Sequence, residues 1–132
     1  MRKLIVLLAL IFTVTFSSPS FAEWTEVEKD VNGNTFYVDF ERIRKVDGYI
    51  YYWDLNDYVK PLGGKYLSSK ANFQGDCKLF RFKPLSFSYH KQPMGGGTGD
   101  TPTIPEKHKG WNYPTPNSID ENILKTVCYI AN

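Results

Sequence analysis

The sequence predicts an α+β fold, in which a small antiparallel β-sheet of about five to six strands packs against a C-terminal α-helix and is joined to it by one disulfide. Short segments of alternating character, separated by Gly, Asn, Asp and Pro, fill residues 24–82. An amphipathic segment follows Ser118, and each of the two regions carries one cysteine, Cys77 or Cys128. These observations carry the prediction.

The first 22 residues have the organisation of a signal peptide. Arg2 and Lys3 precede an apolar run over 4–16, and Ser20-Phe21-Ala22 supplies the small residues of a cleavage site. Thirteen apolar-rich residues are too few to cross about 30 Å of hydrocarbon as a helix. No cysteine follows the cleavage site to accept a lipid. We therefore expect one domain over 23–132 in an exported, soluble protein, periplasmic, secreted or at the cell surface, and not a lipoprotein.

Turn residues divide the first half of the mature chain into strands. Segments 25–29 and 35–39 flank Asn32-Gly33, a pair that readily takes the positive φ of a hairpin turn. A second turn at 46–48 precedes a strand over 49–55. Alternation places four apolar residues of this strand on one face, which we expect to supply much of the core: Tyr49, Tyr51, Trp53 and Leu55.

Two further strands are predicted before a long connection. Extended segments cover 65–73 and 77–82, with Phe80 and Phe82 on one side of the second. Residues 91–113 hold most of the remaining Gly and Pro. We expect this connection to be a long, exposed and flexible loop.

The last segment is a predicted helix that begins at a capping box. Ser118 and Glu121 have the Ser-x-x-Glu spacing that satisfies the first free amides of a helix. The apolar stripe that follows turns Cys128 toward the sheet. In an oxidising compartment we expect Cys77, at the start of a strand, to bond Cys128, with both sulfurs buried. Closing a loop of about fifty residues stabilises the fold by roughly 4 kcal/mol in the chain-entropy model.

The charge balance argues against nucleic acid and anionic membranes as partners. Of 16 basic residues, Arg2 and Lys3 leave with the signal peptide, so 14 face 14 acidic residues in the mature domain. Binding through counterion release needs a concentrated basic surface, which a neutral domain lacks overall.

One candidate ligand surface stands out in the mature chain. Residues 49–53 contain four aromatic residues, and alternation turns Tyr52 to the face opposite its neighbours, where it is either covered or offered to a ligand. Arg42, Arg44 and Lys45 form the densest basic group nearby. They are either a solvated turn or a group that steers an acidic partner.

The sequence favours a protein that is not an enzyme and needs no cofactor or metal. His90 and His108 are the only histidines, and neither lies in a motif. Gly-x-Ser-x-Gly, His-Glu-x-x-His and paired-cysteine spacings are absent from the sequence. The glycine-rich segment 94–100 lacks the Gly-Lys-Ser/Thr ending of a phosphate-binding loop.

Several motifs in order resemble the surface-adhesin protein E-like domains of Gram-negative bacteria. Trp24 lies at the start of the mature chain. The matching pieces after it are 36–39, 43–44, 52–53 with Leu55 and 57–58, 66–70, 76–78 with Arg81, 94–95, Trp111, and 116–118 before the helix that bears Cys128. The resemblance implies an antiparallel sheet, a C-terminal helix and a disulfide between them. It also implies adhesion to host extracellular matrix proteins, although a fold does not fix a function.

Three functions are compatible with these observations. The first is an exported, adhesin-like binding module with a protein partner, for which the resemblance implies a host matrix protein. The second is a periplasmic or envelope-associated structural protein without an adhesin role. The third, a small hydrolase, requires a concave site where His90 or His108 meets a carboxylate or hydroxyl.

Overall fold

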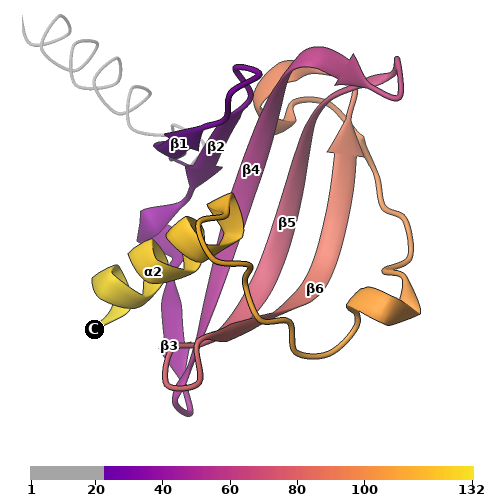
Figure 1. Cartoon of the computed structure of the whole chain (residues 1–132). Coiled ribbons are helices and arrows are strands. Elements are labelled where there is room, and N and C mark those ends of the chain that lie inside the picture. The colour runs from indigo at the N-terminus through magenta and orange to yellow at the C-terminus, as the bar shows by residue number, and fades with distance from the viewer. Residues whose placement is uncertain (1–22) are drawn as a thin grey trace, which may run out of the picture.

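A computed structural model describes residues 23–132, so the predicted signal peptide lies outside the described residues. The chain forms an antiparallel sheet and one C-terminal helix, which confirms the predicted fold class (Figure 1). The strands are β1 (Thr25–Lys29), β2 (Thr35–Val38), β3 (Arg44–Val46), β4 (Tyr49–Leu62), β5 (Tyr66–Asp76), β6 (Arg81–His90) and β7 (Gly99–Asp100). Short 3-10 turns η1 (Phe40–Arg42), η2 (Pro93–Gly95) and η3 (Glu106–His108) and the helix α2 (Ile119–Ala131) complete the elements.

The sheet follows the order of the chain because hairpins join most neighbours. The strand order is β1-β2-β4-β5-β6-β7, with β3 pairing β4 beyond the end of β2. The predicted turn between the first two strands is present, with Gly33 at φ 88°. Asp30 Oδ1 accepts from the backbone N–H groups of Asn32 and Asn34, which fixes that turn.

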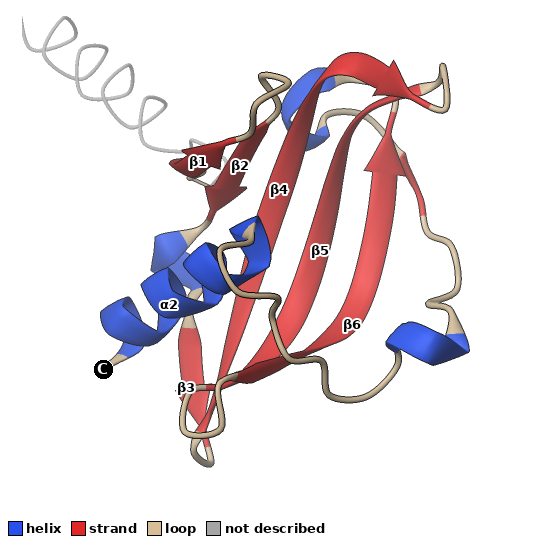
Figure 2. Cartoon of the chain, viewed as in Figure 1, coloured by secondary structure: helices blue, strands red, loops and turns tan. Residues whose placement is uncertain are grey.

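Helix α2 crosses one face of the sheet, where it contacts β1 and β4 (Figures 1 and 2). The capping box is present, since Ser118 Oγ accepts from the N–H of Glu121 at 3.1 Å. Glu121 Oε1 in turn accepts from the N–H of Asn117 at 3.3 Å. The buried core between helix and sheet consists of Val38, Ile50, Tyr52, Ile123, Leu124 and Val127.

The face of β4 that packs against the helix is not the one predicted for the core. Ile50 and Tyr52 are 2% and 3% exposed and face the helix, whereas Tyr49, Tyr51 and Trp53 are half-buried on the other side. Of the four predicted core residues only Leu55 is fully buried, beneath the glycine-rich segment on the face away from α2. Both faces of this strand are rich in aromatic residues, so alternation alone does not reveal which face the helix covers.

The Cys77–Cys128 disulfide is present and joins α2 to the sheet. The two Cα atoms are 5.7 Å apart. Cys77 lies in the turn after β5 and not at the start of a strand, because residues 77–80 form a turn and β6 begins at Arg81. Phe80 has φ 53° in this turn. Both cysteines are half-buried as whole residues and pack against the core.

The connection from β6 to α2 wraps around the open edge of the sheet (Figure 1). It is largely irregular, as predicted, but it is fastened at several points. β7 pairs with the end of β6, and Asn112 exchanges two backbone hydrogen bonds with Phe82 at 2.7 and 2.9 Å. The final stretch of the connection therefore lies beside the first residues of β6.

The β4–β5 hairpin extends beyond the strands that flank β4. β2 pairs with β4 only up to Asp57, and the β4–β5 register shifts between Asp57 and Leu62. Gly63 and Gly64 form the tip, both with positive φ, and Val59 beside it is 61% exposed. Few packing contacts hold this tip.

Candidate functional site

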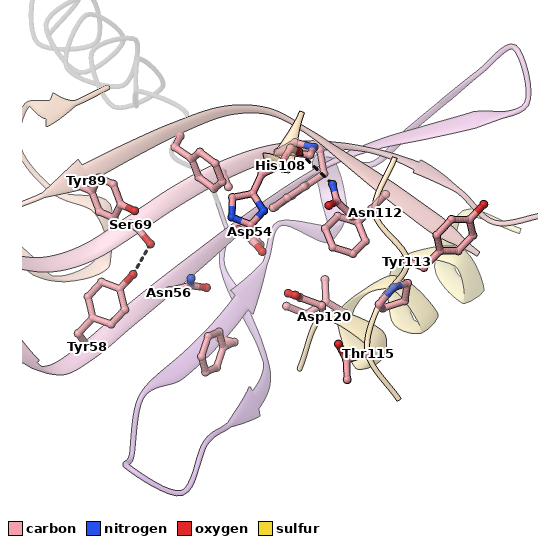
Figure 3. Close-up of a pocket in the computed structure, with 18 residues that line it drawn as sticks. Asp54, Asn56, Tyr58, Ser69, Tyr89, His108, Asn112, Tyr113, Thr115 and Asp120 are labelled. Atoms are coloured by element: carbon pink, nitrogen blue, oxygen red, sulfur yellow. Dashed lines mark hydrogen bonds between the residues drawn. The ribbon is translucent and has the colours of Figure 1, made fainter. Parts of the chain in front are cut away.

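The face of the sheet that α2 covers only in part holds a pocket of about 450 Å³ (Figure 3). Its floor comes from β2, β4, β5 and β6, and its rim from His108, residues 112–115 and the first turn of α2. Residues paired across neighbouring strands share a face, and this register gathers aromatic residues into the pocket. These are Phe36, Tyr58, Phe73, Phe82, Phe87 and Tyr89.

Two acidic side chains line this pocket. Asp54 is 7% exposed, and desolvation, reinforced by the charge of Asp120, holds its pKa well above the ordinary value. Asp120 lies at the rim, still exposed to solvent, and partial burial raises its pKa too. Tyr52 has its pKa raised well above 10.0 by burial and by these two carboxylates. The charged form of Asp54 is thus disfavoured while the pocket is empty.

The neutral polar groups of the pocket are unevenly satisfied. Tyr58 Oη and Ser69 Oγ share a hydrogen bond of 2.7 Å, and burial raises the pKa of Tyr58. Asn56 Oδ1 is buried and has no hydrogen-bond partner among the described residues. At the rim, Asn112 Nδ2 donates to the backbone oxygens of His108 and Gly110 and orders the connection there.

The opposite face of the sheet has a second hollow, which we call the Trp24–Trp53 hollow. Its lining residues are Trp24, Arg42, Trp53, Lys70, Met94, Gly95 and Gly96, and its volume is about 480 Å³. The guanidinium of Arg42 lies 5.7 Å from the centre of the Trp53 ring. Its Nε is 3.9 Å from Oδ2 of the buried Asp39, which holds the charge over the ring.

One wall of the Trp24–Trp53 hollow is the glycine-rich segment that the sequence presents as flexible. The N–H of Met94 donates to Asp57 Oδ1 at 2.9 Å, and that of Gly95 to Ser68 Oγ at 2.8 Å. Gly95 has φ 70°, and a Cβ there would lie 2.9 Å from Lys70 Cδ. Glycine is needed at this position because the segment packs directly on the sheet.

The structure separates the residues of the predicted ligand surface. Tyr52 does not lie on the surface as predicted. It is buried and stacks on Phe73 in the core, with the ring centres 5.4 Å apart. Arg44 pairs with Tyr51 and so lies on the face of the Trp24–Trp53 hollow. Lys45 pairs with the core residue Ile50, and its Nζ donates to Asn132 Oδ1 on the helix side.

The two histidines lie in different surroundings, one buried and one exposed. His90 is 3% exposed, with Ser88 Oγ 2.8 Å from its Nε2 and the Gly96 carbonyl 3.2 Å from its Nδ1. It therefore ties the glycine-rich segment to β6. His108 is exposed at the rim of the pocket. No carboxylate of residues 23–132 hydrogen-bonds either ring, and this part of the chain has no cluster of three or more metal-ligating side chains.

Sequence analysis does not identify the pocket residues Asp54, Asn56 and Asp120. The sequence does contain a signal for two of them, because Asp54 and Asn56 continue the alternation of the core residues Ile50 and Tyr52. Polar residues at core-facing positions of a strand indicate a site or a paired charge. Nothing local points to Asp120, which the fold alone brings to the pocket.

The fold and the two hollows define the class of this protein. It is a small disulfide-linked α+β domain with a hollow on each face of its sheet. Within the described residues, no helix is long and apolar enough to cross a membrane. The chain belongs to the surface-adhesin protein E family, whose model matches residues 24–129. This is a family of surface adhesins and not of enzymes.

Solved structures of Haemophilus influenzae protein E share the fold. Crystal form II of that protein is 17% identical with a TM-score of 0.63, covering 84% of this chain and 91% of that one. A second structure of it is also 17% identical, with a TM-score of 0.62 and 84% and 87% coverage. Protein E from non-typeable Haemophilus influenzae is 16% identical, with a TM-score of 0.58 and 85% and 79% coverage. No curated protein sequence matches the chain.

Proposed function

We propose that this protein is an exported, adhesin-like binding module that attaches to a protein partner through the Trp24–Trp53 hollow, and that host extracellular matrix proteins are its partner class. The observation that carries the proposal is the cation of Arg42 held over the ring of Trp53, beside Trp24. Trp and Arg are the residues most enriched where protein interfaces concentrate their binding energy. Membership of a surface-adhesin family supports the same function.

The charge of this face defines the partner further. Arg42, Arg44 and Lys70 carry positive charge on or beside the hollow. Opposite charge across an interface steers encounter and speeds association, an effect that salt screens. We therefore expect an acidic patch on the partner and an association rate that falls as salt is raised.

The test is a binding assay on immobilised matrix proteins with the exported protein and three variants. Trp53→Ala and Arg42→Ala should each weaken binding by about 30-fold, the equivalent of about 2 kcal/mol at an interface hot spot. Lys45→Ala is the matched control, because it removes the same charge from the other face and should bind as the wild type does. Thermal unfolding of each variant separates a lost contact from a lost fold.

Cell fractionation and protease treatment of intact cells give an independent check. Adhesion requires that the protein be accessible on the outside of the cell. A protein found only in the periplasm would contradict the proposal and favour an envelope-associated role instead. Equal binding by the wild type and both hollow variants would contradict the assignment of the surface.

A further inference from the structure

Asp54 is an unusual residue to find under a helix in the middle of a sheet. Asp54 is 7% exposed and lines the pocket, and no hydrogen bond from another described residue reaches its carboxyl group. A buried polar group without a partner costs free energy, and a buried charge costs more. Two residues on, the Asn56 oxygen is buried and equally without a partner. Two hydrogen-bond acceptors on one strand therefore face the same pocket (Figure 3).

The surroundings of these acceptors select against an anion. No Lys or Arg lines the pocket, and its one basic group is the exposed His108 at the rim. Asp120 adds a second carboxyl on the helix side of the cavity. Aromatic rings, which attract cations to their faces, form much of the remaining wall.

We propose that this pocket binds an organic cation, with its primary ammonium or guanidinium group between Asp54 and Asp120 and its carbon chain against the rings of Phe73, Phe87 and Tyr89. The proposal does not rest on the proposed adhesive surface, because the two hollows lie on opposite faces of the sheet. A volume of about 450 Å³ lies within the range of pockets for small organic ligands. Asn56 Oδ1 would accept a further hydrogen bond from the same cationic group.

A metal ion fits this site less well. The described residues offer no group of three or more metal-ligating side chains, whereas hard cations take six or more oxygens. An ammonium or guanidinium group needs only two or three acceptors, and it also gains from the aromatic wall.

Cation binding at this site must be coupled to a proton. Burial keeps the pKa of Asp54 high in the empty pocket, and a positive charge beside the carboxyl would lower that pKa. At pH values between the pKa of Asp54 in the empty pocket and its lowered pKa beside the cation, Asp54 gives up its proton to solvent as the ammonium or guanidinium enters. The titratable groups around it are Asp120 on α2, Tyr52 and Tyr58 on β4, Tyr89 on β6, and His108 and Tyr113 on the connection.

Isothermal titration calorimetry of the exported protein tests the proposal with three cationic probes. Nα-acetyl-lysine methylamide and Nα-acetyl-arginine methylamide stand for side chains of a partner, and 1,5-diaminopentane stands for a free amine. Nα-acetyl-norleucine methylamide has a similar carbon chain without the charge, and N-acetylglucosamine represents a neutral sugar. We expect at least one cation to bind and both neutral probes to bind at least tenfold more weakly. Titrations in two buffers of different ionisation enthalpy should show protons released on binding.

Substitutions place the binding in this pocket. Asp54→Asn keeps the shape of the uncharged side chain, so we expect it to fold and to weaken cation binding at least about tenfold. Asp47→Asn removes a carboxyl from the exposed β3–β4 turn and should leave binding unchanged. Preference for the amino-acid derivatives over the diamine would identify a partner side chain as the source. The proposal is overturned if no cation binds, if norleucine or sugar binds as well, or if Asp54→Asn binds cations like the wild type.

Discussion

Replacing Asp54 by Asn should stabilise the protein, and the gain should grow as the pH rises. The pKa of Asp54 is raised in the folded state by desolvation and by Asp120. The folded protein therefore holds the Asp54 proton at pH values where the unfolded chain, with an aspartate pKa near 3.9, has lost it. Holding this proton contributes fully to the free energy of unfolding at pH values below the pKa of the unfolded chain. The contribution is lost as the pH rises toward the pKa of the folded protein. Asn carries no proton to lose.

The magnitude follows from linkage. A single group contributes at most about 1.4 kcal/mol to the free energy of unfolding for each pH unit between its two pKa values. Because Asp54 is 7% exposed, solvent screening does little to narrow the interval between the two pKa values. We therefore expect the difference between Asp54→Asn and wild type to be small at pH 4 and to rise by up to about 1.4 kcal/mol per pH unit above it.

Urea unfolding of the two proteins from pH 4 to pH 8, followed by tryptophan fluorescence, measures this difference. Other groups titrate alike in both proteins and largely cancel, although Asp120 is coupled to Asp54 and adds with the same sign. Asp47→Asn controls for the loss of one negative charge. A pH-independent difference, or a wild type that gains on the variant as pH rises, would refute the account of Asp54 as a buried acid without a partner.

Three further predictions concern the packing that positions both hollows. Replacing Cys77 and Cys128 together by Ala opens a loop with a sequence separation of 51. This double substitution should lower the free energy of unfolding, measured in urea melts, by about 4 kcal/mol. No loss would indicate a denatured state that stays ordered without the bridge. Ser118→Ala removes the acceptor for the Glu121 N–H and should cost about 1 kcal/mol by the same assay; Ser118→Asp should restore it. Gly75→Ala places a Cβ 2.8 Å from Ile50 Cγ1. It should lower the free energy of unfolding by about 1–3 kcal/mol and lower the melting temperature. An unchanged melting temperature would show that Ile50 repacks freely.

The features that the sequence predicts correctly have local causes. The Asn32-Gly33 turn and the Ser118 cap depend on residues a few positions apart, so they can be read without the rest of the fold. The helical stripe that turns Cys128 inward is likewise a property of one segment. Together with the cysteine count, these signals are sufficient to predict an α+β domain with a bridge from its helix to its sheet.

The features that the sequence does not predict depend on tertiary contacts. The strand predicted over 77–82 is β6 (Arg81–His90) in the structure. It continues past Pro84 because that residue lies where the β5–β6 register shifts, a place that tolerates a missing N–H. The face of β4 that is buried depends on where α2 crosses. The pocket is formed only when the connection after β6 and the first turn of α2 reach the same part of the sheet, which is why Asp120 escapes sequence analysis.

The projecting tip of the β4–β5 hairpin offers a practical route to the open question of location. Gly63 and Gly64 lie at an exposed turn that packs against no other element, and neither hollow includes them. Exposed loop tips of this kind accept inserted sequence with little loss of stability. A short epitope placed between the two glycines would report, by antibody labelling of whole cells, whether the domain is accessible on the cell surface. Such a reporter would leave both ends of the chain, the disulfide and the two candidate binding surfaces untouched.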